Sequence, residues 1–229
     1  MTRLFDYAGW AHRAHQFVLM LKDRPGFKVE ASYVAPPFQP AQSNALDRRL
    51  AQYLPDTFRH FLTLGTAAID CRYSLDEDSA AGREFSKLFI GSDLYGGARI
   101  GPANALPRFA RSCLERSRVL LEDQDTDRAD DWVESLPIIA VGNGDYVALN
   151  GIIGREIDDP AVLYLSHDGD DAVMTESFTA FLAAWEHLCY VSPDLLLQNS
   201  FFAAGYALLD PDSRRAKKLR QLFGLSAIC

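Results

Sequence analysis

The apolar positions between residues 136 and 188 follow two different periods. Residues 138–141 and 146–149 are short apolar runs rich in β-forming residues, and Asn143-Gly144 lies between them. Asn-Gly tolerates the positive φ angles of a tight turn, so this segment predicts a β-hairpin. A third apolar run covers residues 161–168, and SFTAFLAAWEHL then changes to helical spacing with Ser177 or Thr175 as N-cap. The apolar face of that helix consists of Phe178, Phe181, Leu182, Trp185 and Leu188.

Similar patterns predict the elements of the N-terminal part. Residues 4–22 have helical spacing, and the extended sequence FKVEASYV follows them. An irregular connector contains Pro36, Pro37 and Pro40. The next helical face consists of Leu46, Leu50, Tyr53 and Leu54. Pro55 suits the start of a second helix, which Gly65 is placed to end, and the strict alternation of AIDCRYSL predicts a half-buried strand.

The middle and the C-terminal part have weaker patterns. In residues 76–135 we expect a strand or two around the glycines of FSKLFIGSDLYGGARIG, and a helix in PRFARSCLERSRVLL. EDQDTDRADDWVES is interpreted as a charged connector that Trp132 anchors in the core. A helix is expected after Pro193, and DPDSRRAKKLRQLFGL predicts a basic amphipathic helix capped by Asp212 or Ser213. The expected fold is therefore α+β, a mostly antiparallel twisted sheet with helices packed on one face.

Length and composition agree with one large globular domain. The chain has 229 residues, of which 48% are apolar, so it can bury a sizeable core. Cys71, Cys113, Cys189 and Cys229 are far apart and form no CxxC pair, which indicates reduced thiols. The N-terminal stretch is interrupted by charged residues, and no run reaches membrane-spanning length. We therefore expect a cytoplasmic protein that does not bind membranes.

The net charge of −8 is concentrated in two segments. Residues 122–134 hold seven acidic residues and one arginine, a net charge of −6. Residues 156–176 hold seven acidic residues and no lysine or arginine, a net charge of −7, which leaves the rest of the chain at +5. Direct nucleic-acid binding is disfavoured, because phosphate contacts require a basic face. A basic partner is compatible with this charge, and so is a role of the acidic loops in solubility alone.

One cluster resembles a metal site, namely His167-Asp168-Gly169-Asp170-Asp171. Carboxylates suit a hard cation, and histidine could join for a transition metal. Turn residues at a connection between strand and helix are the ordinary interpretation of the same sequence. Gly142-Asn143-Gly144 lacks the third glycine of a dinucleotide fingerprint, and the chain contains no Walker lysine and no GxSxG elbow. We therefore assign no catalytic residue, no cofactor and no metal.

Four stretches resemble motifs of the SUKH superfamily, in the same order and at similar spacing. They are LDRRLAQYLPDTFRHFL, LPIIAVGNGDYVALN, VLYLSHD and SFTAFLAAW, and together they cover roughly residues 44–190. Gly65-Thr66-Ala67 stands where members of the family often have Asn-Gly-Gly, and residues 76–135 form a long insert. On this division, residues 1–43 pack on the core as an N-terminal segment, and residues 191–229 form a helical C-terminal extension. The superfamily includes a fungal cell-wall synthesis regulator and many bacterial immunity proteins.

The resemblance implies a non-enzymatic immunity protein that neutralises a cognate bacterial toxin, such as a nuclease, by direct binding. The acidic segments 122–134 and 156–171 are the candidate contact surface. Its candidate partner-binding residues are Asp158, Asp159, Asp168, Asp170 and Asp171. Two alternatives remain open at this point. One is an intracellular regulator or scaffold that docks through residues 212–229, and the other is a metal-dependent hydrolase that uses His167, Asp168, Asp170 and Asp171.

Overall fold

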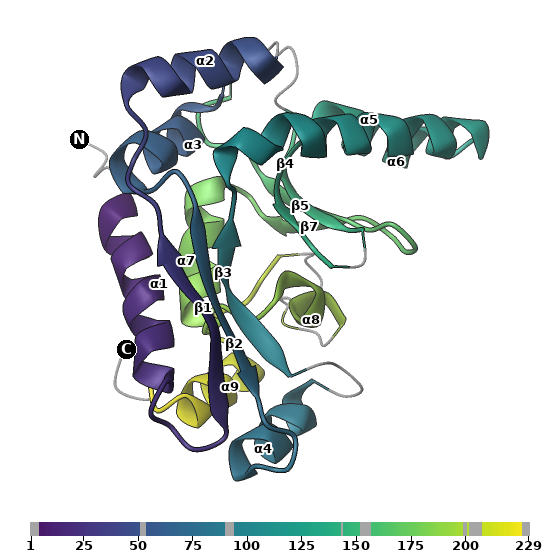
Figure 1. Cartoon of the computed structure of the whole chain (residues 1–229). Helices are drawn as coiled ribbons and strands as arrows, with labels where there is room; N and C mark the ends of the chain where they lie inside the picture. The colour runs from purple at the N-terminus through teal and green to yellow at the C-terminus, as the bar shows by residue number, and fades with distance from the viewer. Residues whose placement is uncertain are drawn as a thin grey trace.

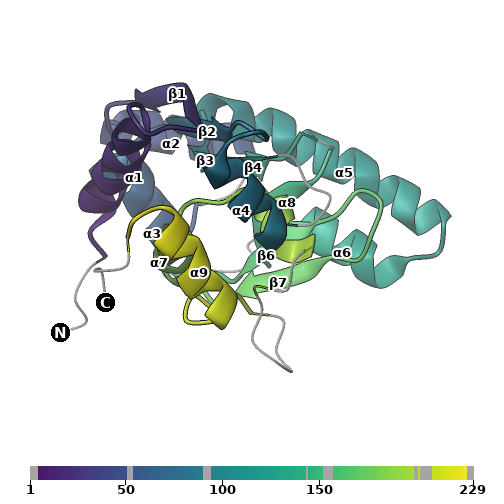
Figure 2. The same cartoon turned by 90° about the horizontal axis from the view of Figure 1, so that it is seen from below.

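A computed structural model describes residues 5–50, 54–89, 94–142, 144–151, 157–198, 201 and 208–225 (Figures 1 and 2). Within these residues the fold is α+β, with two antiparallel sheets. The helices described are α1 (Tyr7–Leu21), α2 (Pro40–Leu50), α3 (Asp56–His60), α4 (Ala80–Leu88), α5 (Leu106–Glu122), α6 (Thr126–Glu134), α7 (Phe178–His187), α8 (Pro193–Gln198) and α9 (Arg214–Leu222). A π-helical turn over Phe61–Gly65 continues α3, and a 3-10 turn over Ala103–Ala105 precedes α5.

The two sheets divide the strands by sequence order. The first contains β1 (Phe27–Val34), β2 (Ile69–Leu75) and β3 (Tyr95–Ile100), and the second contains β4 (Leu136–Ala140), β5 (Tyr146–Leu149), β6 (Val162–Leu165) and β7 (Ala172–Thr175). In each sheet the spatial order equals the order along the chain. The prediction of an antiparallel α+β fold is confirmed. The prediction of one sheet is wrong, because the strands form two.

The separation of the sheets has a local cause at the outer edge of β3. The N–H of Gly97 donates to the carbonyl of Tyr190 at 2.6 Å, and Gly96 pairs with Val191. This edge of β3 is therefore occupied by the segment after α7, and β4 cannot pair along it. The two sheets meet through a hydrogen bond from the N–H of Gly101 to the carbonyl of Ile138 (3.3 Å).

The second sheet is covered by helices on both faces, not on one as the sequence suggested. Trp132, Cys113 and Leu120 of α5 and α6 form a small core cluster against one face of β5 and β6. Alternate residues of the same strands join the main core, which includes Phe178 and Trp185 of α7. Because both faces are buried, the strands are continuously apolar in sequence, and the period of two is hidden.

The N-terminal and C-terminal segments are integrated into the main core. β1 pairs with β2 in the first sheet, and the indole of Trp10 in α1 donates to the carbonyl of Leu182 in α7 at 2.8 Å. The guanidinium of Arg24 donates to the carbonyls of Leu222 and Phe223 at the end of α9. The first two contacts tie the N-terminal segment to residues 44–190, and α9 is tied to them by the hydrogen bond from Arg220 to the carbonyl of His187.

Several local predictions are confirmed. The strands of the 138–149 hairpin, the third strand and α7 form as expected, and the Ser177 hydroxyl accepts from the N–H of Ala180 as N-cap. The basic helix α9 also forms, with Ser213 as its cap. The prediction of a charged connector over residues 122–135 is wrong, because residues 126–134 form α6, whereas the prediction that Trp132 is anchored in the core is confirmed. Asn143, Tyr53, Glu156 and Cys229 lie outside the described residues, so the predictions made on these positions are not tested.

Among the described residues, no helix combines the length and apolar character needed to cross a bilayer.

Candidate functional site

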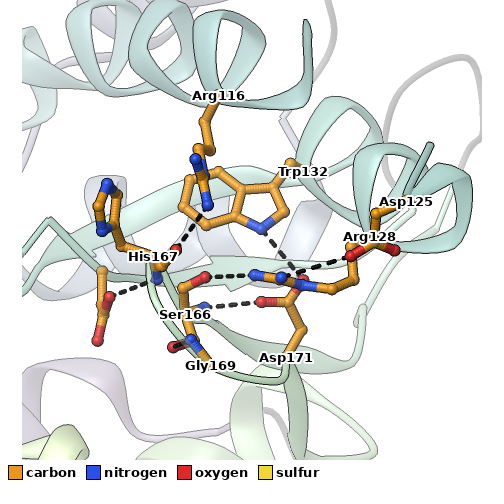
Figure 3. Close-up of polar contacts among 9 residues, drawn as sticks. Arg116, Asp125, Arg128, Trp132, Ser166, His167, Gly169 and Asp171 are labelled. Carbon is orange, nitrogen blue, oxygen red and sulfur yellow. Dashed lines mark hydrogen bonds and ion pairs between the residues drawn. The ribbon is translucent and has the colours of Figure 1, made fainter. Parts of the chain in front are cut away.

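The loop between β6 and β7, residues 166–171, is held against α6 by the carboxylate of Asp171 (Figure 3). Its Oδ1 accepts from the N–H of Ser166 at 2.7 Å, and its Oδ2 accepts from the indole of Trp132 at 3.1 Å. The Nε of Arg128 lies 3.4 Å from the same Oδ2. The Asp171 side chain is 6% exposed, and burial raises the pKa of this carboxyl above its ordinary value. Asp171 therefore closes the loop from inside the fold.

Two further contacts fix the outer part of this loop. The N–H of His167 donates to the buried carboxylate of Asp145 at 2.6 Å, and the hydroxyl of Tyr164 donates to the other oxygen of that carboxylate. Arg116 of α5 donates to the carbonyl of His167 at 2.7 Å, and Arg128 donates to the carbonyl of Ser166 at 2.7 Å. The loop is thus anchored to the hairpin, to α5 and to α6, and its outward side chains start from a fixed backbone.

These anchors bring together the two acidic segments that are separate in sequence. Asp168 and Asp170 are exposed on the loop, and Asp127 and Asp130 are exposed on α6. Arg128 bridges the two elements, since its guanidinium also contacts Asp125 at 3.4 Å. Burial, followed by the charges of Glu134, Asp130 and Asp127, raises the pKa of Asp131. We name as the acidic face the side chains of Glu122, Asp123, Asp125, Asp127, Asp130, Asp131, Glu134, Asp168 and Asp170.

Apolar side chains are exposed on the same pair of helices. Leu114, Val119 and Leu121 of α5 and Val133 of α6 are between 37% and 51% exposed. α5 and α6 lie side by side at one end of the molecule, away from α1 and α9, as both views show (Figures 1 and 2). Exposed apolar residues bordered by charges are typical of surfaces that bind another protein.

A pocket opens between α5 and the loop. It has a volume of about 320 Å³ and is lined by Ser112, Glu115, Arg116, Val119, Trp132, Gly144, Tyr146 and His167. The rings of Trp132 and Tyr146 meet edge to face, with their centroids 6.2 Å apart. The Nε of Arg116 is buried and has no hydrogen-bond partner among the described residues. The pocket therefore offers aromatic walls and one cationic group to a side chain of a partner.

The other two predicted site residues lie at the opposite end of β6. The carbonyl of Asp158 accepts from the N–H and the hydroxyl of Thr57, at 3.0 and 2.8 Å. The carboxylate of Asp159 accepts from the N–H and the hydroxyl of Thr179 at the start of α7. Asp159 stabilises the first turn of that helix, whereas the Asp158 side chain is exposed. The structure thus brings Asp168, Asp170 and Asp171 together and separates them from this pair by the length of a buried strand.

The side chains considered for a metal point in different directions. The Nδ1 of His167 lies 2.6 Å from Asp168, whose side chain is 87% exposed. Figure 3 shows the imidazole of His167 turned away from the Asp171 carboxylate. Within the described ranges, no three side chains of His, Cys, Asp or Glu are grouped so that they could hold a metal ion. The hydrogen bonds of Asp171 account for its position without a cation.

No family model matches this sequence, and no curated protein shows significant similarity to it.

The sequence did not reveal how the acidic residues divide into exposed and internal groups. Asp171 and Asp159 have the same local composition as Asp170 and Asp158, yet their carboxylates have partners inside the fold. The anchoring residues Arg116, Arg128 and Asp145 were also missed. The single arginine within seven acidic residues was the one available signal for Arg128, because an isolated cation in such a stretch is expected to form ion pairs.

Proposed function

We propose that this chain is a non-enzymatic immunity protein that binds a cognate bacterial toxin through the acidic face and the adjoining pocket. The observation that carries the proposal is the combination, on α5, α6 and the 166–171 loop, of the acidic face with four exposed apolar side chains. Such a surface complements a basic protein with apolar anchors, as a nuclease toxin would be. The proposal assigns Asp168 and Asp170 to direct contact and Asp171 to positioning of the loop.

The rigid anchoring of the loop supports binding as its role. Three elements hold its backbone, the hairpin through Asp145, α5 through Arg116 and α6 through Arg128. A partner that contacts Asp168 and Asp170 therefore does not have to order the loop, and less conformational entropy is lost on binding.

The resemblance of residues 44–190 to the SUKH superfamily also supports this function. The fold would then be SUKH-like, with α5 and α6 supplied by the insert 76–135. On this proposal the insert carries most of the contact surface, so the partner differs from those of members that lack it.

Growth rescue tests the function. The chain is co-expressed with the product of the adjacent upstream gene, and growth is compared with and without the chain. Rescue together with a stable purified complex is expected. If the neighbour is toxic but neither rescue nor a complex is obtained, the immunity function is refuted. If the neighbour is not toxic but forms a complex, the regulatory alternative on the same fold replaces it.

Association kinetics test the assigned surface. Reversal of two exposed charges, Asp130→Lys with Asp168→Lys, should lower the association rate about tenfold at low salt. The difference should shrink at 1 M salt, where the Debye length is about 3 Å. Glu77→Lys with Asp78→Lys is the matched control, because these acidic residues are exposed before α4 at the far end of the molecule. Equal rates for both double variants would refute the surface assignment.

The pocket is tested separately by filling it. Val119 lines the pocket and is 42% exposed, so Val119→Trp should block the pocket without disturbing the core. Leu19→Trp is the control, because Leu19 is 38% exposed and lies on α1, away from the assigned surface (Figure 1). We expect Val119→Trp to raise the dissociation rate at least tenfold, as for a central anchor, and Leu19→Trp to leave it nearly unchanged.

A further inference from the structure

We propose that a second cavity, on the side of the molecule opposite the acidic face, binds a small amphiphilic carboxylic acid. The cavity has a volume of about 400 Å³ and lies where α1, the end of α7 and α9 meet. It is lined by Arg13, Gln16, Phe17, Met20, Glu186, His187, Tyr190, Arg220 and Leu225. Figures 1 and 2 both show α1 and α9 away from α5 and α6. This site is independent of the proposed immunity function.

The size and the lining of the cavity are those of a ligand site. Small-molecule pockets commonly measure about 300–1,000 Å³ and combine apolar walls with a few polar groups. Phe17, Met20 and Leu225 supply apolar wall here, and Phe17 also packs on the ring of Tyr190 with centroids 5.4 Å apart. The buried polar groups, Tyr190 and Arg220, come from the segment after α7 and from α9, and α1 adds the polar residues Arg13 and Gln16. A ligand with an apolar body and a polar end therefore fits this division.

Arg220 determines the charge of the polar end. This residue is 5% exposed, and its Nη1 donates to the carbonyls of His187 and Pro211, at 3.1 and 2.6 Å. Among the described residues no carboxylate forms an ion pair with Arg220. A buried guanidinium without a counterion is unfavourable unless an anion approaches it, and guanidinium groups pair with carboxylates in a bidentate manner. The cavity thus presents a fixed cation to its contents.

Tyr190 supplies to the same cavity a polar group that has no partner among the described residues. This residue is 2% exposed, and its hydroxyl has no hydrogen-bond partner within the described part of the chain. Tyr190 and Cys189 have positive φ angles of 53° and 56°, a backbone conformation that L-residues seldom adopt, and this backbone fixes where the Tyr190 ring lies. A carboxylate oxygen that accepts from this hydroxyl would satisfy the donor.

The acidic residue of the cavity does not compete for Arg220. Glu186 pairs with Arg13, whose Nε lies 2.6 Å from Oε1, and Arg13 also approaches Asp6 at 3.7 Å. Arg13 and Glu186 thus neutralise each other at the rim, and Arg220 keeps its full charge. The chemistry selects a monocarboxylate with a chain or ring, over a neutral apolar molecule or a cation.

Calorimetric titration of the full chain with decanoate, and with decanol as the neutral analogue, tests this proposal. We expect saturable 1:1 binding of decanoate and at least about tenfold weaker binding of decanol, since hydrogen bonds between charged groups are stronger than those between neutral groups. Met20→Trp should abolish decanoate binding, because Met20 lines the cavity and is 43% exposed. Leu19→Trp is the matched control on α1, since Leu19 is 38% exposed and does not line the cavity. Arg220 is left intact because its Nη1 holds two carbonyls of the fold.

Each other outcome would overturn the proposal. Absence of saturable decanoate binding would show that the cavity does not take such ligands. Equal affinity for decanol would refute recognition by Arg220. Decanoate binding that survives Met20→Trp, or that Leu19→Trp removes as well, would place the ligand elsewhere on the chain.

Discussion

Replacement of Asp171 by alanine should destabilise the fold far more than the same change at Asp168, three residues earlier. The two residues belong to one acidic loop, but their surroundings differ. The Asp171 side chain is 6% exposed, whereas that of Asp168 is 87% exposed. The prediction therefore separates an internal structural carboxylate from one that is available to a partner.

The expected magnitude follows from the groups that Asp171 leaves behind. Asp171→Ala removes the acceptor of the Ser166 N–H and of the Trp132 indole N–H, and Trp132 is 1% exposed. A buried donor left without an acceptor costs about 1–3 kcal/mol. Removal of a buried charge, which burial already disfavours as the raised pKa shows, offsets part of this loss. We expect a loss of about 2–4 kcal/mol, a large share of the roughly 5–15 kcal/mol of a typical domain.

Urea denaturation followed by circular dichroism measures this loss. Asp168→Ala is the control and should stay within about 0.5 kcal/mol of the parent chain, as an exposed substitution does. The slopes of the transitions should be equal, so that the midpoints report stability alone. A free energy of unfolding for Asp171→Ala within 0.5 kcal/mol of the parent would refute the assignment of Asp171 as the residue that closes the loop.

Three further predictions concern other parts of the chain. Gly97 has φ +131°, and a Cβ at this position would lie 2.1 Å from the Cys71 carbonyl oxygen, so Gly97→Ala should lower the free energy of unfolding by more than about 3 kcal/mol. Gly142→Ala is the control in the same urea assay and should lower it little, because a Cβ at Gly142 would have no heavy atom within 4 Å. Burial and neighbouring acids raise the pKa of Asp131 in the fold, so the contribution of this residue to stability is favourable below the ordinary carboxyl pKa and is lost as pH rises through the folded pKa. Asp131→Asn should therefore raise the melting temperature at pH 7 and leave it unchanged near about pH 3. A lower melting temperature of the variant at pH 7 would contradict this. Burial raises the pKa of Cys71 to about 11 and those of Cys113 and Cys189 to about 12. At most one of the chain's four thiols should therefore react with Ellman's reagent at pH 8 until urea exposes the rest. Two fast-reacting thiols in the native chain would argue against this packing.

The elements with strong periodicity could be predicted from the sequence. β2 alternates over seven residues, and α7 has its apolar face and its serine cap within one short segment. In α6, by contrast, only Ala129 and Trp132 are buried, so two buried apolar positions among four acidic residues gave too little helical signal. β7 has the sequence AVMT, which shows no alternation of apolar and polar residues and follows directly on the acidic loop, so it gave no strand signal of its own.

The division into two sheets could not be predicted, because a non-local contact decides it. The edge of β3 is covered by Tyr190 and Val191, which are about ninety residues away along the chain. That segment reaches the edge through positive φ angles at Cys189 and Tyr190, and nothing in the sequence marks these positions. Non-glycine residues in this conformation are held by the surrounding structure and not by local preference.

The candidate site was predictable in its charge but not in its shape. The sequence showed two acidic segments, and it included Asp168, Asp170 and Asp171 among the candidate residues. It could not show that Asp171 and Arg128 join the loop to α6, because this depends on side chains 43 residues apart. It also could not show that Asp158 and Asp159 lie beyond a buried strand from the other three.

Hydrogen exchange on the complex with the product of the adjacent upstream gene tests the central claim most directly. Amide protection is compared between the free chain and the chain saturated with this partner. Our account predicts new protection in α5, in α6 and in the 166–171 loop, with little change in α1 and α9. Protection confined to α1, α9 or the first sheet, or a complex that leaves α6 and the loop unprotected, would contradict the assignment of the acidic face as the binding surface.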